Sequence, residues 1–486
     1  MIHEALAQCV EEDFPHVLTD MQREALQVLA EFFMSPNSDA VFILRGYAGT
    51  GKTSLIGALV KTLRRIHRNP LLLAPTGRAA KVFSLYSEGP AFTIHKTIYR
   101  QKSLADENAT FTLDYNKHKN TLFIVDEASM IANQGSSNSV FGTGLLLDDL
   151  VRYVYEGAGC KLLLVGDTAQ LPPVGEAESP ALNANVLSGY GLTPYEANLT
   201  QVVRQAEDSG ILWNATSLRE LICTDCTAQL PRIQVAGYPD LKVVPGSELI
   251  ETLEDSYHHA GMDGTMVVTR SNKRAVIYNN GIRARIFDRE GELTQGDLVM
   301  VAKNNYFWAE EAKQDLPEGV QSPLEFIANG DIAEVRRIHR VHEQYGFRFA
   351  TATLRFPDYE NYELEARVLL DTLQSESPSL SREEADRLFW AVQKDYADIR
   401  NKRERMKKIK VDPYFNALQL KYAYAVTCHK AQGGQWQRVF IDQGYITPDR
   451  ADISYLRWLY TAFTRSSQML YLVNWPKEQI TEKDVS

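Results

Sequence analysis

The chain has 486 residues, of which 44% are hydrophobic and 23% are charged, and its formal net charge is −10. This composition is typical of globular proteins, and the length predicts about three or four compact units. No apolar run approaches the roughly 18 residues needed to cross a bilayer, and residues 1–15 lack both a signal-peptide core and an Arg-rich transit pattern.

Cysteine content and net charge exclude few further classes of protein. Five cysteines are too few for a disulfide framework in a chain of this length, so we expect a reducing compartment. Cys223 and Cys226 have the spacing of half a zinc site, but no second Cys or His pair follows at a suitable interval, which favours an incidental pair. The negative charge argues against a nucleic-acid partner, but a protein that grips a strand in a narrow channel needs only a local excess of positive charge.

The first informative segment is 18–22, Leu-Thr-Asp-Met-Gln, which precedes an amphipathic helix. The amide of Gln22 can pair with the adenine edge as donor and acceptor together. Alternatively, Thr19 or Asp20 caps the helix and Gln22 is part of its exposed first turn. The spacing alone supports the two interpretations equally.

Residues 46–53, Gly-Tyr-Ala-Gly-Thr-Gly-Lys-Thr, match the phosphate-binding loop pattern. Residues 40–44 predict a buried strand before the loop and residues 53–65 predict a helix after it, which is the context that the pattern requires. We expect Lys52 to reach the β- and γ-phosphates of ATP and the Thr53 hydroxyl to bind Mg²⁺. The residues expected to hold the nucleotide are Gly46, Gly49, Thr50, Gly51, Lys52, Thr53 and Ser54.

Two carboxylates follow the apolar run 121–125, which predicts a strand of the same domain. We assign Asp126 to the magnesium shell and Glu127 to the attacking water, because phosphoryl transfer needs one group for each task. A third apolar run, 162–165, is followed by Gly-Asp-Thr-Ala-Gln-Leu-Pro-Pro-Val-Gly at 166–175. This order places Asp167 and Gln170 at the carboxyl edge of a parallel sheet, where ligands bind in open α/β folds.

Two segments read as insertions. In 98–120, Phe111, Leu113 and Tyr115 alternate with polar residues, which predicts a β-hairpin. Its aromatic side chains, Phe111 above all, would either stack on bases or pack the hairpin onto its own lobe, and the sequence favours neither.

The second insertion, 291–413, contains alternating strands at 298–301, 332–338 and 347–354 and a turn signal at Asn329-Gly330, which together predict a small β-barrel. Residues 381–384 read as a capping box that opens a helix. Residues 400–410 hold seven Lys or Arg side chains against Glu404. This run would either bind phosphates or be a solvated helix terminus.

These stretches, in this order, resemble the superfamily 1 helicases, and most closely the 5′→3′ branch that contains RecD and phage Dda. The matching segments are 18–22 (Q motif), 46–53 (motif I), 72–81 (Ia), 93–96 (a strand-contact motif), 126–129 (II), 166–175 (III), 199–205 (IV), 268–272 (the motif after IV), 424–433 (V) and 460–465 (VI). The resemblance covers about residues 18–474.

The resemblance implies roles for individual residues. Gln22 would read adenine, Gln170 would sense the γ-phosphate, Arg204 and Arg465 would stabilise charge on the transferred phosphoryl group, and Gly433 would lie at the nucleotide. The residues that would line the single-strand track are Pro75, Thr76, Lys81, His95, Thr427, His429 and Lys430, with Phe111 on a strand-separating pin. Three of these have ordinary structural alternatives: Thr76 at a strand end, His95 as a helix-start histidine, and His429 as support for the ATP site.

The expected fold is α/β, with two RecA-like parallel-sheet lobes of the P-loop NTPase type. Residues 1–97 and 121–190 would form the first lobe, and residues 191–290 and 414–486 the second, with strands at 266–268, 439–441 and 470–473. The two insertions would add a β-hairpin and a small β-barrel followed by a helix.

The resemblance implies an ATP- and Mg²⁺-dependent DNA helicase that moves 5′→3′ on single-stranded DNA and unwinds a duplex fork. The expected setting is the cytoplasm of a bacterial or phage-like system, with the protein acting as a monomer without a membrane partner, and with single-strand-binding or recombination proteins as candidate partners. Two alternatives stay open: an RNA helicase or ribonucleoprotein remodeller of the same superfamily, and a non-catalytic ATP-binding scaffold subunit. Retention of the catalytic side chains argues against the scaffold.

Overall fold

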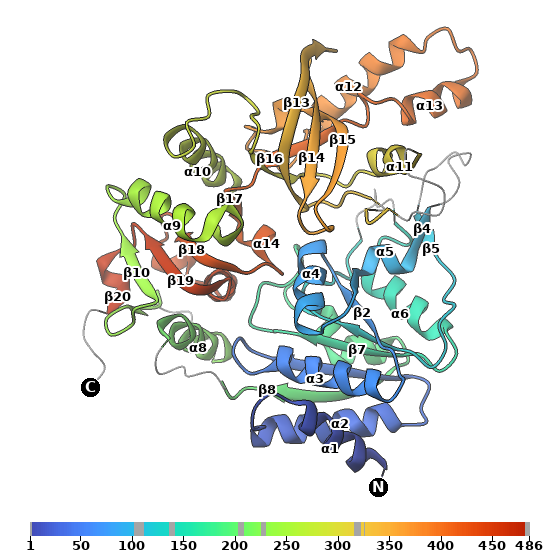
Figure 1. The fold of residues 1–486 in the computed structure, drawn as a ribbon, viewed down its shortest axis with the longest axis vertical. Coiled ribbons are helices and arrows are strands. Elements are labelled where there is room, and N and C mark those ends of the chain that lie inside the picture. Colours follow the sequence, from blue (N-terminus) through green and yellow to red (C-terminus); the bar gives the residue numbers. More distant parts are fainter. Residues whose placement is uncertain are drawn as a thin grey trace.

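The computed structural model describes residues 2–101, 111–135, 141–202, 209–224, 230–314, 322–324 and 326–481 (Figure 1). The chain forms two α/β lobes side by side, with a β-barrel above them in the view of Figure 1. Within the described ranges, no helix is long and apolar enough to cross a membrane.

The first lobe is built on a six-stranded parallel sheet with strand order β3-β2-β6-β7-β1-β8. Its strands are β1 (Ala40–Gly46), β2 (Leu71–Ala74), β3 (Ala91–Thr93), β6 (Leu122–Val125), β7 (Lys161–Gly166) and β8 (Thr193–Leu199). The helices are α1 (Ile2–Asp13), α2 (Asp20–Met34), α3 (Lys52–Arg65), α4 (Gly77–Tyr86), α5 (Ile94–Ile98), α6 (Leu146–Glu156) and α7 (Ala184–Gly189).

The apolar run of β1 explains how this lobe holds together. Successive strand side chains point to opposite faces of a sheet. Phe42 and Leu44 enter the apolar cluster formed with α1, α2 and α3, whereas Val41 and Ile43 enter the cluster formed with α5 and α6. The sheet is therefore buried on both faces, and its carboxyl edge is left for ligands.

The second lobe has a five-stranded parallel sheet with order β10-β19-β18-β11-β17. Its strands are β10 (Leu241–Val244), β11 (Thr265–Thr269), β17 (Ala425–Thr427), β18 (Trp436–Asp442) and β19 (Ser466–Val473), and a small pair joins β9 (Ile233–Gln234) to β20 (Ile480–Thr481). The helices are α8 (Gly210–Cys223), α9 (Leu249–Gly264), α10 (Asn272–Arg285), α14 (Cys428–Ala431) and α15 (Ile453–Phe463).

The insertions have the predicted types. A closed barrel contains β12 (Leu298–Val301), β13 (Ile332–Gln344), β14 (Phe347–Phe356), β15 (Tyr362–Leu369) and β16 (Leu418–Tyr422). Around it lie α11 (Phe307–Gln314), α12 (Arg382–Asp395) and α13 (Lys402–Lys410). The hairpin pairs β4 (Tyr99–Gln101) with β5 (Phe111–Leu113). The capping box at Ser381 and Glu384 is formed, with an N···O distance of 2.9 Å from Ser381 N to Glu384 Oε2.

The two-lobed α/β fold with a barrel and a hairpin is confirmed, but two predicted boundaries were wrong. Strand β8 belongs to the first lobe, where Ala40 pairs with Thr193, so the second lobe does not begin at residue 191. Strand β16 closes the barrel against β12, so the second insertion extends beyond residue 413. Both strands mix polar and apolar residues instead of forming a continuous apolar run, and only their partners show which sheet they join.

Candidate active site and nucleic-acid interface

The phosphate-binding loop lies between β1 and α3. Gly49 and Gly51 have φ values of 76° and 83°, a conformation that glycine adopts without a steric penalty. A Cβ added to Gly46 would lie 2.8 Å from Lys52 Cγ, so the lysine side chain runs close along the loop. Lys52 Nζ donates to the carbonyl oxygens of Tyr47, at 2.8 Å, and Gly46. The loop thus has the glycine cradle and the cation that an ATP phosphate chain needs.

Gln22 is not in an exposed first turn of α2, as one alternative predicted. Thr19 caps α2, as one alternative proposed, but Gln22 is completely buried and completes a capping box with it. Its Oε1 accepts from Thr19 N at 3.0 Å and its Nε2 donates to the carbonyl of Thr50 at 2.9 Å. The amide therefore joins the start of α2 to the phosphate loop. Its pairing with adenine stays a prediction.

Asp126 and Glu127 lie directly after β6. Burial raises the pKa of both carboxyl groups, because it disfavours the charged form, and the nearby charge of Lys52 offsets only part of this rise. Asp126 Oδ1 accepts from Glu127 N at 2.9 Å, and the hydroxyl of Tyr86 donates to Asp126 Oδ2. Two partly buried acids near one lysine form a site that a divalent cation would neutralise.

Gln170 lies in the loop after β7 and is 7% exposed. Its Oε1 is buried without a hydrogen-bond partner among the described residues. An unpaired buried amide is costly unless a ligand supplies its partner. The amide therefore fits the predicted contact with a phosphate oxygen, once its oxygen and nitrogen are assigned accordingly.

Magnesium would depend on ligands from outside the protein. In the part of the chain that the structure describes, no group of three or more His, Cys, Asp or Glu could hold a metal ion. Thr53, which is exposed, and Asp126 are the residues present for it. This small donor set fits Mg²⁺, which binds through one or two protein oxygens together with phosphates and water.

The second lobe reaches into this site through Tyr460 of α15. The Tyr460 hydroxyl accepts from Ala48 N in the phosphate loop at 2.9 Å and donates to Asp167 Oδ2 at 2.6 Å. Next to it, Leu171 N donates to Thr461 Oγ1 at 2.9 Å, and Gln432 Nε2 donates to the Leu171 carbonyl at 2.7 Å. The second lobe therefore holds the loop after β7 at both Asp167 and Leu171.

Arg465 lies at the same contact between the two lobes, called the seam below, and is 3% exposed. It donates to the carbonyls of Thr461 and Gly434 at 3.0 and 3.2 Å, and its charge lowers the pKa of Glu127. Arg465 is thus bonded within the second lobe, and it lies close enough to Glu127 of the first lobe for its charge to act on that carboxylate. The other predicted arginine, Arg204, lies outside the described residues.

Two tyrosines of the site escaped the sequence analysis. Tyr460 begins the predicted motif VI, but only Arg465 in that motif received a role. Tyr86 ends α4, and its contact with Asp126 joins segments 40 residues apart. A tyrosine at a motif boundary is the only local signal for the first, and nothing local indicates the second.

Gly433 lies at the seam between the lobes, on the side of α4. Its φ is 71°, and a Cβ there would lie 3.1 Å from Ala79 Cβ and 3.3 Å from Thr76 Oγ1. These contacts place the glycine against α4 of the first lobe, and its assignment to the nucleotide stays a prediction. Thr76 caps α4 by accepting from Ala79 N at 3.2 Å.

The two lysines predicted to contact the strand are held by barrel turns. Lys81 Nζ lies 3.2 Å from Asp358 Oδ1 and donates to the carbonyl of Pro357 at 3.0 Å. Lys430 Nζ donates to Asn329 Oδ1. The barrel therefore reaches α4 of the first lobe and α14 of the second, across the seam where Gly433 meets Thr76.

Behind these turns lies Asp331, which accepts hydrogen bonds at 3.1 Å from the hydroxyl of Tyr359. Burial raises the pKa of Asp331 to about 7. His429 and Lys430 are exposed residues, yet desolvation by neighbouring protein atoms lowers the pKa of both. Pro75 follows the last residue of β2 and Thr427 is the last residue of β17, and both are partly exposed.

His95 and Phe111 belong to an aromatic cluster. The His95 ring centroid lies 4.7 Å from that of Phe141, and burial lowers the His95 pKa to about 4, so the ring is neutral at pH 7. Phe111 lies 5.0 Å from Phe141 and 4.3 Å from Tyr306. For both residues the structure favours the packing alternative over contact with the strand.

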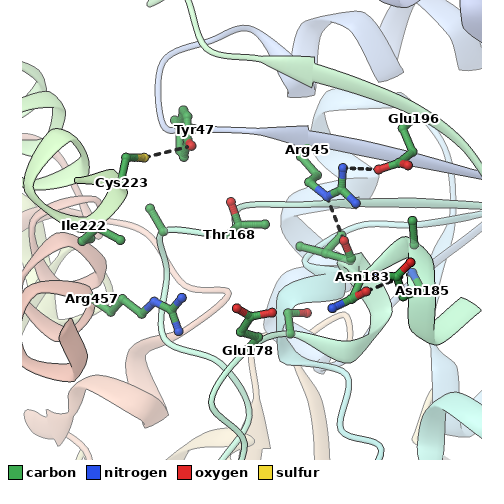
Figure 2. A pocket seen from close by; sticks show the side chains of 14 residues that line it. Arg45, Tyr47, Thr168, Glu178, Asn183, Asn185, Glu196, Ile222, Cys223 and Arg457 are labelled. Atoms are coloured by element: carbon green, nitrogen blue, oxygen red, sulfur yellow. Dashed lines mark hydrogen bonds and ion pairs between the residues drawn. The ribbon is translucent and has the colours of Figure 1, made fainter. Parts of the chain in front are cut away.

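A separate pocket of about 540 Å³ opens between the lobes beside the phosphate loop (Figure 2). Tyr47 and Cys223 meet across it, with 3.5 Å between the hydroxyl oxygen and Sγ, and Arg45 pairs with Glu196 at 2.5 Å. Its lining contains neither Lys52 nor the carboxylates after β6, so it is not the phosphate site. Cys226 lies outside the described residues.

Comparisons with known proteins agree with this arrangement. Residues 17–221 match a family model described as an AAA domain, and residues 422–473 match the UvrD-like helicase C-terminal domain. A protein of Acanthamoeba polyphaga mimivirus, R530, described as uncharacterized, is 23% identical over 90% of this chain and 96% of its own length.

Two named helicases are also similar. The ATP-dependent RecD2 DNA helicase of Deinococcus radiodurans is 34% identical over 176 residues, and the ATP-dependent DNA helicase dda of Enterobacteria phage T4 is 24% identical over 291 residues. The matched regions cover 36% and 58% of this chain, but only 21% and 61% of those two relatives. A Pif1 helicase from Bacteroides, solved in complex with ADP-AlF3 and ssDNA, aligns over 96% of this chain and 95% of that chain with 15% identity and a TM-score of 0.47.

The order of the motifs, the two-lobed fold with its shared site and the two family matches support one assignment, similarity to the superfamily 1B helicases.

Proposed function

We propose that the protein is an ATP-dependent DNA helicase that moves 5′→3′ along single-stranded DNA and separates the duplex ahead of it. The observation that carries this proposal is the divided ATP site. Tyr460 of the second lobe is bonded to the phosphate loop and to Asp167 of the first, and the charge of Arg465 acts on Glu127. A site that is complete only when the lobes are together links hydrolysis to their relative movement.

Within this site the residues would divide the work of phosphoryl transfer. Lys52 would bind the β- and γ-phosphates, Glu127 would orient the attacking water, and Gln170 would contact the γ-phosphate. Arg465, with Arg204, would stabilise the charge that develops on the phosphoryl group. Magnesium held by Thr53 and Asp126 would supply further charge neutralisation at the phosphates.

Coupling to the strand would run through the loop after β7. Leu171 in this loop is bonded to Gln432 and Thr461, and Gln432 adjoins Gly433 at the seam with Thr76. A movement of Gln170 on loss of the γ-phosphate would therefore be passed to the predicted strand track through Leu171 and Gln432. The 5′→3′ direction and the preference for DNA rest on the family resemblance.

The proposal is tested by ATP hydrolysis in the presence of single-stranded DNA or RNA, with the Lys52→Ala variant alongside. Lys61→Ala is the matched control, because Lys61 lies on the same helix, is largely exposed and contacts only Asp13 among the described acids. We expect DNA to stimulate hydrolysis in the wild type and in Lys61→Ala, and no hydrolysis in Lys52→Ala. Stimulation of hydrolysis by RNA alone would favour the RNA helicase. A wild-type rate of hydrolysis equal to that of Lys52→Ala would favour the non-catalytic scaffold subunit.

A further inference from the structure

Helix α13 carries a dense positive charge on an acidic protein. Residues 400–410 contain seven Lys or Arg and one Glu, whereas the net charge of the chain is −10. Lys402, Lys407 and Lys408 are exposed, and Ile409 is completely buried in a cluster with Phe349 of the barrel. Ile409 thus anchors the helix to the barrel, while the exposed lysines face solvent.

Both ends of this helix are tied down. The Asn401 side chain accepts from Arg403 N at 2.9 Å and Glu404 N at 3.4 Å. At the other end, Asn416 Nδ2 donates to the carbonyl of Lys410 at 2.7 Å. A helix of nine residues is too short to persist alone, so these caps and the buried Ile409 hold the charged surface in place.

The helix dipole accounts for only part of this charge. Glu404 in the first turn and the lysines of the last turn agree with the dipole, but Arg400, Lys402 and Arg403 precede or occupy the first turn, where cations are disfavoured. Arg403 and Lys407 are four residues apart and Lys407 and Lys410 three apart, spacings at which like charges repel. A polyanion bound along this surface would relieve the repulsion.

The helix also lies near the predicted pin. Phe111 of β5 contacts Tyr306, which directly precedes α11. Tyr306 and Glu310, with Phe389 of α12 and Lys410 of α13, line one groove of about 400 Å³. In Figure 1, α11 lies between the β4–β5 hairpin and the pair α12 and α13. The basic helix and the hairpin thus lie on the same side of the molecule.

We propose that α13 binds the phosphate backbone of the duplex ahead of the fork, an inference that rests on the proposed helicase function. Duplex DNA carries one charge per about 1.7 Å of its axis, so a helix about 13 Å long spans several phosphates. The single strand would occupy the seam between the lobes, where Gly433 meets Thr76. With the single strand in this seam, the duplex ahead of it is the part of a fork left to contact α13.

The test compares binding of a forked duplex with binding of its single-stranded tail, by fluorescence anisotropy over a range of salt concentrations. The variant is Lys407→Gln/Lys408→Gln. The control is Lys242→Gln/Lys477→Gln, which removes the same charge from exposed lysines of the second lobe. A second variant, Lys407→Arg/Lys408→Arg, keeps the charge and should bind like the wild type.

Loss of two phosphate contacts lowers the salt slope of fork binding by about 1.8 and weakens binding at 0.1 M salt by up to roughly 60-fold. We expect this loss for the fork only, with tail binding and DNA-stimulated ATP hydrolysis at wild-type levels. Fork binding equal to that of the control would overturn the proposal, and an equal loss for fork and tail would reassign α13 to the single strand. A wild-type protein that neither binds the tail nor hydrolyses ATP would refute the proposed function itself.

Discussion

Removing the Tyr460 hydroxyl should weaken the closed arrangement of the two lobes. Tyr460 is 1% exposed, and its hydroxyl is bonded to Ala48 N and to the carboxylate of Asp167. A neutral hydrogen bond contributes about 1 kcal/mol and one to a charged group about 1.5–3 kcal/mol. Asp167 keeps its bond from Ala169 N at 2.9 Å, so we take about 3 kcal/mol for the Tyr460→Phe change, or roughly 100-fold in the closed population.

The assay is kcat for DNA-stimulated ATP hydrolysis, measured together with thermal unfolding. Tyr455→Phe is the matched control, because Tyr455 lies on the same helix and is 2% exposed, but its hydroxyl donates to Gln443 within the second lobe, at 2.6 Å. We expect both variants to lose stability and only Tyr460→Phe to lose hydrolysis, by up to about 100-fold. Equal hydrolysis in the two variants would refute the idea that this hydroxyl completes the ATP site.

Three further predictions concern the track and the start of the chain. Asp358→Asn should raise the affinity for single-stranded DNA, because it releases Lys81 from its ion pair with Asp358. A partly exposed ion pair is worth at most about 1 kcal/mol, so we expect a gain of up to about fivefold in a binding titration. Glu360→Gln is the control, and an equal change in affinity in the two variants would contradict the reasoning. The raised pKa of Asp331 favours its protonated form in the folded protein, so its contribution to stability is complete below about pH 4 and is lost as pH rises to about 7. Denaturant titrations should show that the free energy of unfolding falls over this pH range in the wild type and not in Asp331→Asn. The same dependence on pH in both proteins would exclude a contribution from Asp331. Gln22→Ala should lower the free energy of unfolding by about 1–3 kcal/mol in the same titrations, because it leaves buried polar groups unpaired, and an unchanged value would count against the buried amide.

The nucleotide-binding half of the site was predictable because its signals are local. A buried strand, a glycine loop and a helix follow one another within residues 40–65, and the structure has β1, the loop and α3 in those places. The same holds for the carboxylates after β6 and for Gln170 after β7. In each case the side chain leaves the end of a strand, so its place in the sheet fixes its place in the site.

The contacts between distant segments were not predictable. Nothing local shows that Asp358 of a barrel turn would hold Lys81, 277 positions earlier, or that Tyr460 would reach Ala48. Strand β8 was misassigned for the same reason, since its polar residues hide an edge strand that only its pairing with β1 reveals. Gln22 shows that a contact can be hidden even within a recognised motif. The motif identified the position of Gln22, but its buried hydrogen bond is made to Thr50, which lies outside that motif.

The central claim is that ATP hydrolysis between the lobes drives movement from 5′ to 3′ along DNA. The most direct measurement is ATP-dependent unwinding of duplexes that carry either a 5′ or a 3′ single-stranded tail, with Lys52→Ala alongside. We predict unwinding from the 5′ tail only, and none in the variant. Unwinding from the 3′ tail alone would contradict the account.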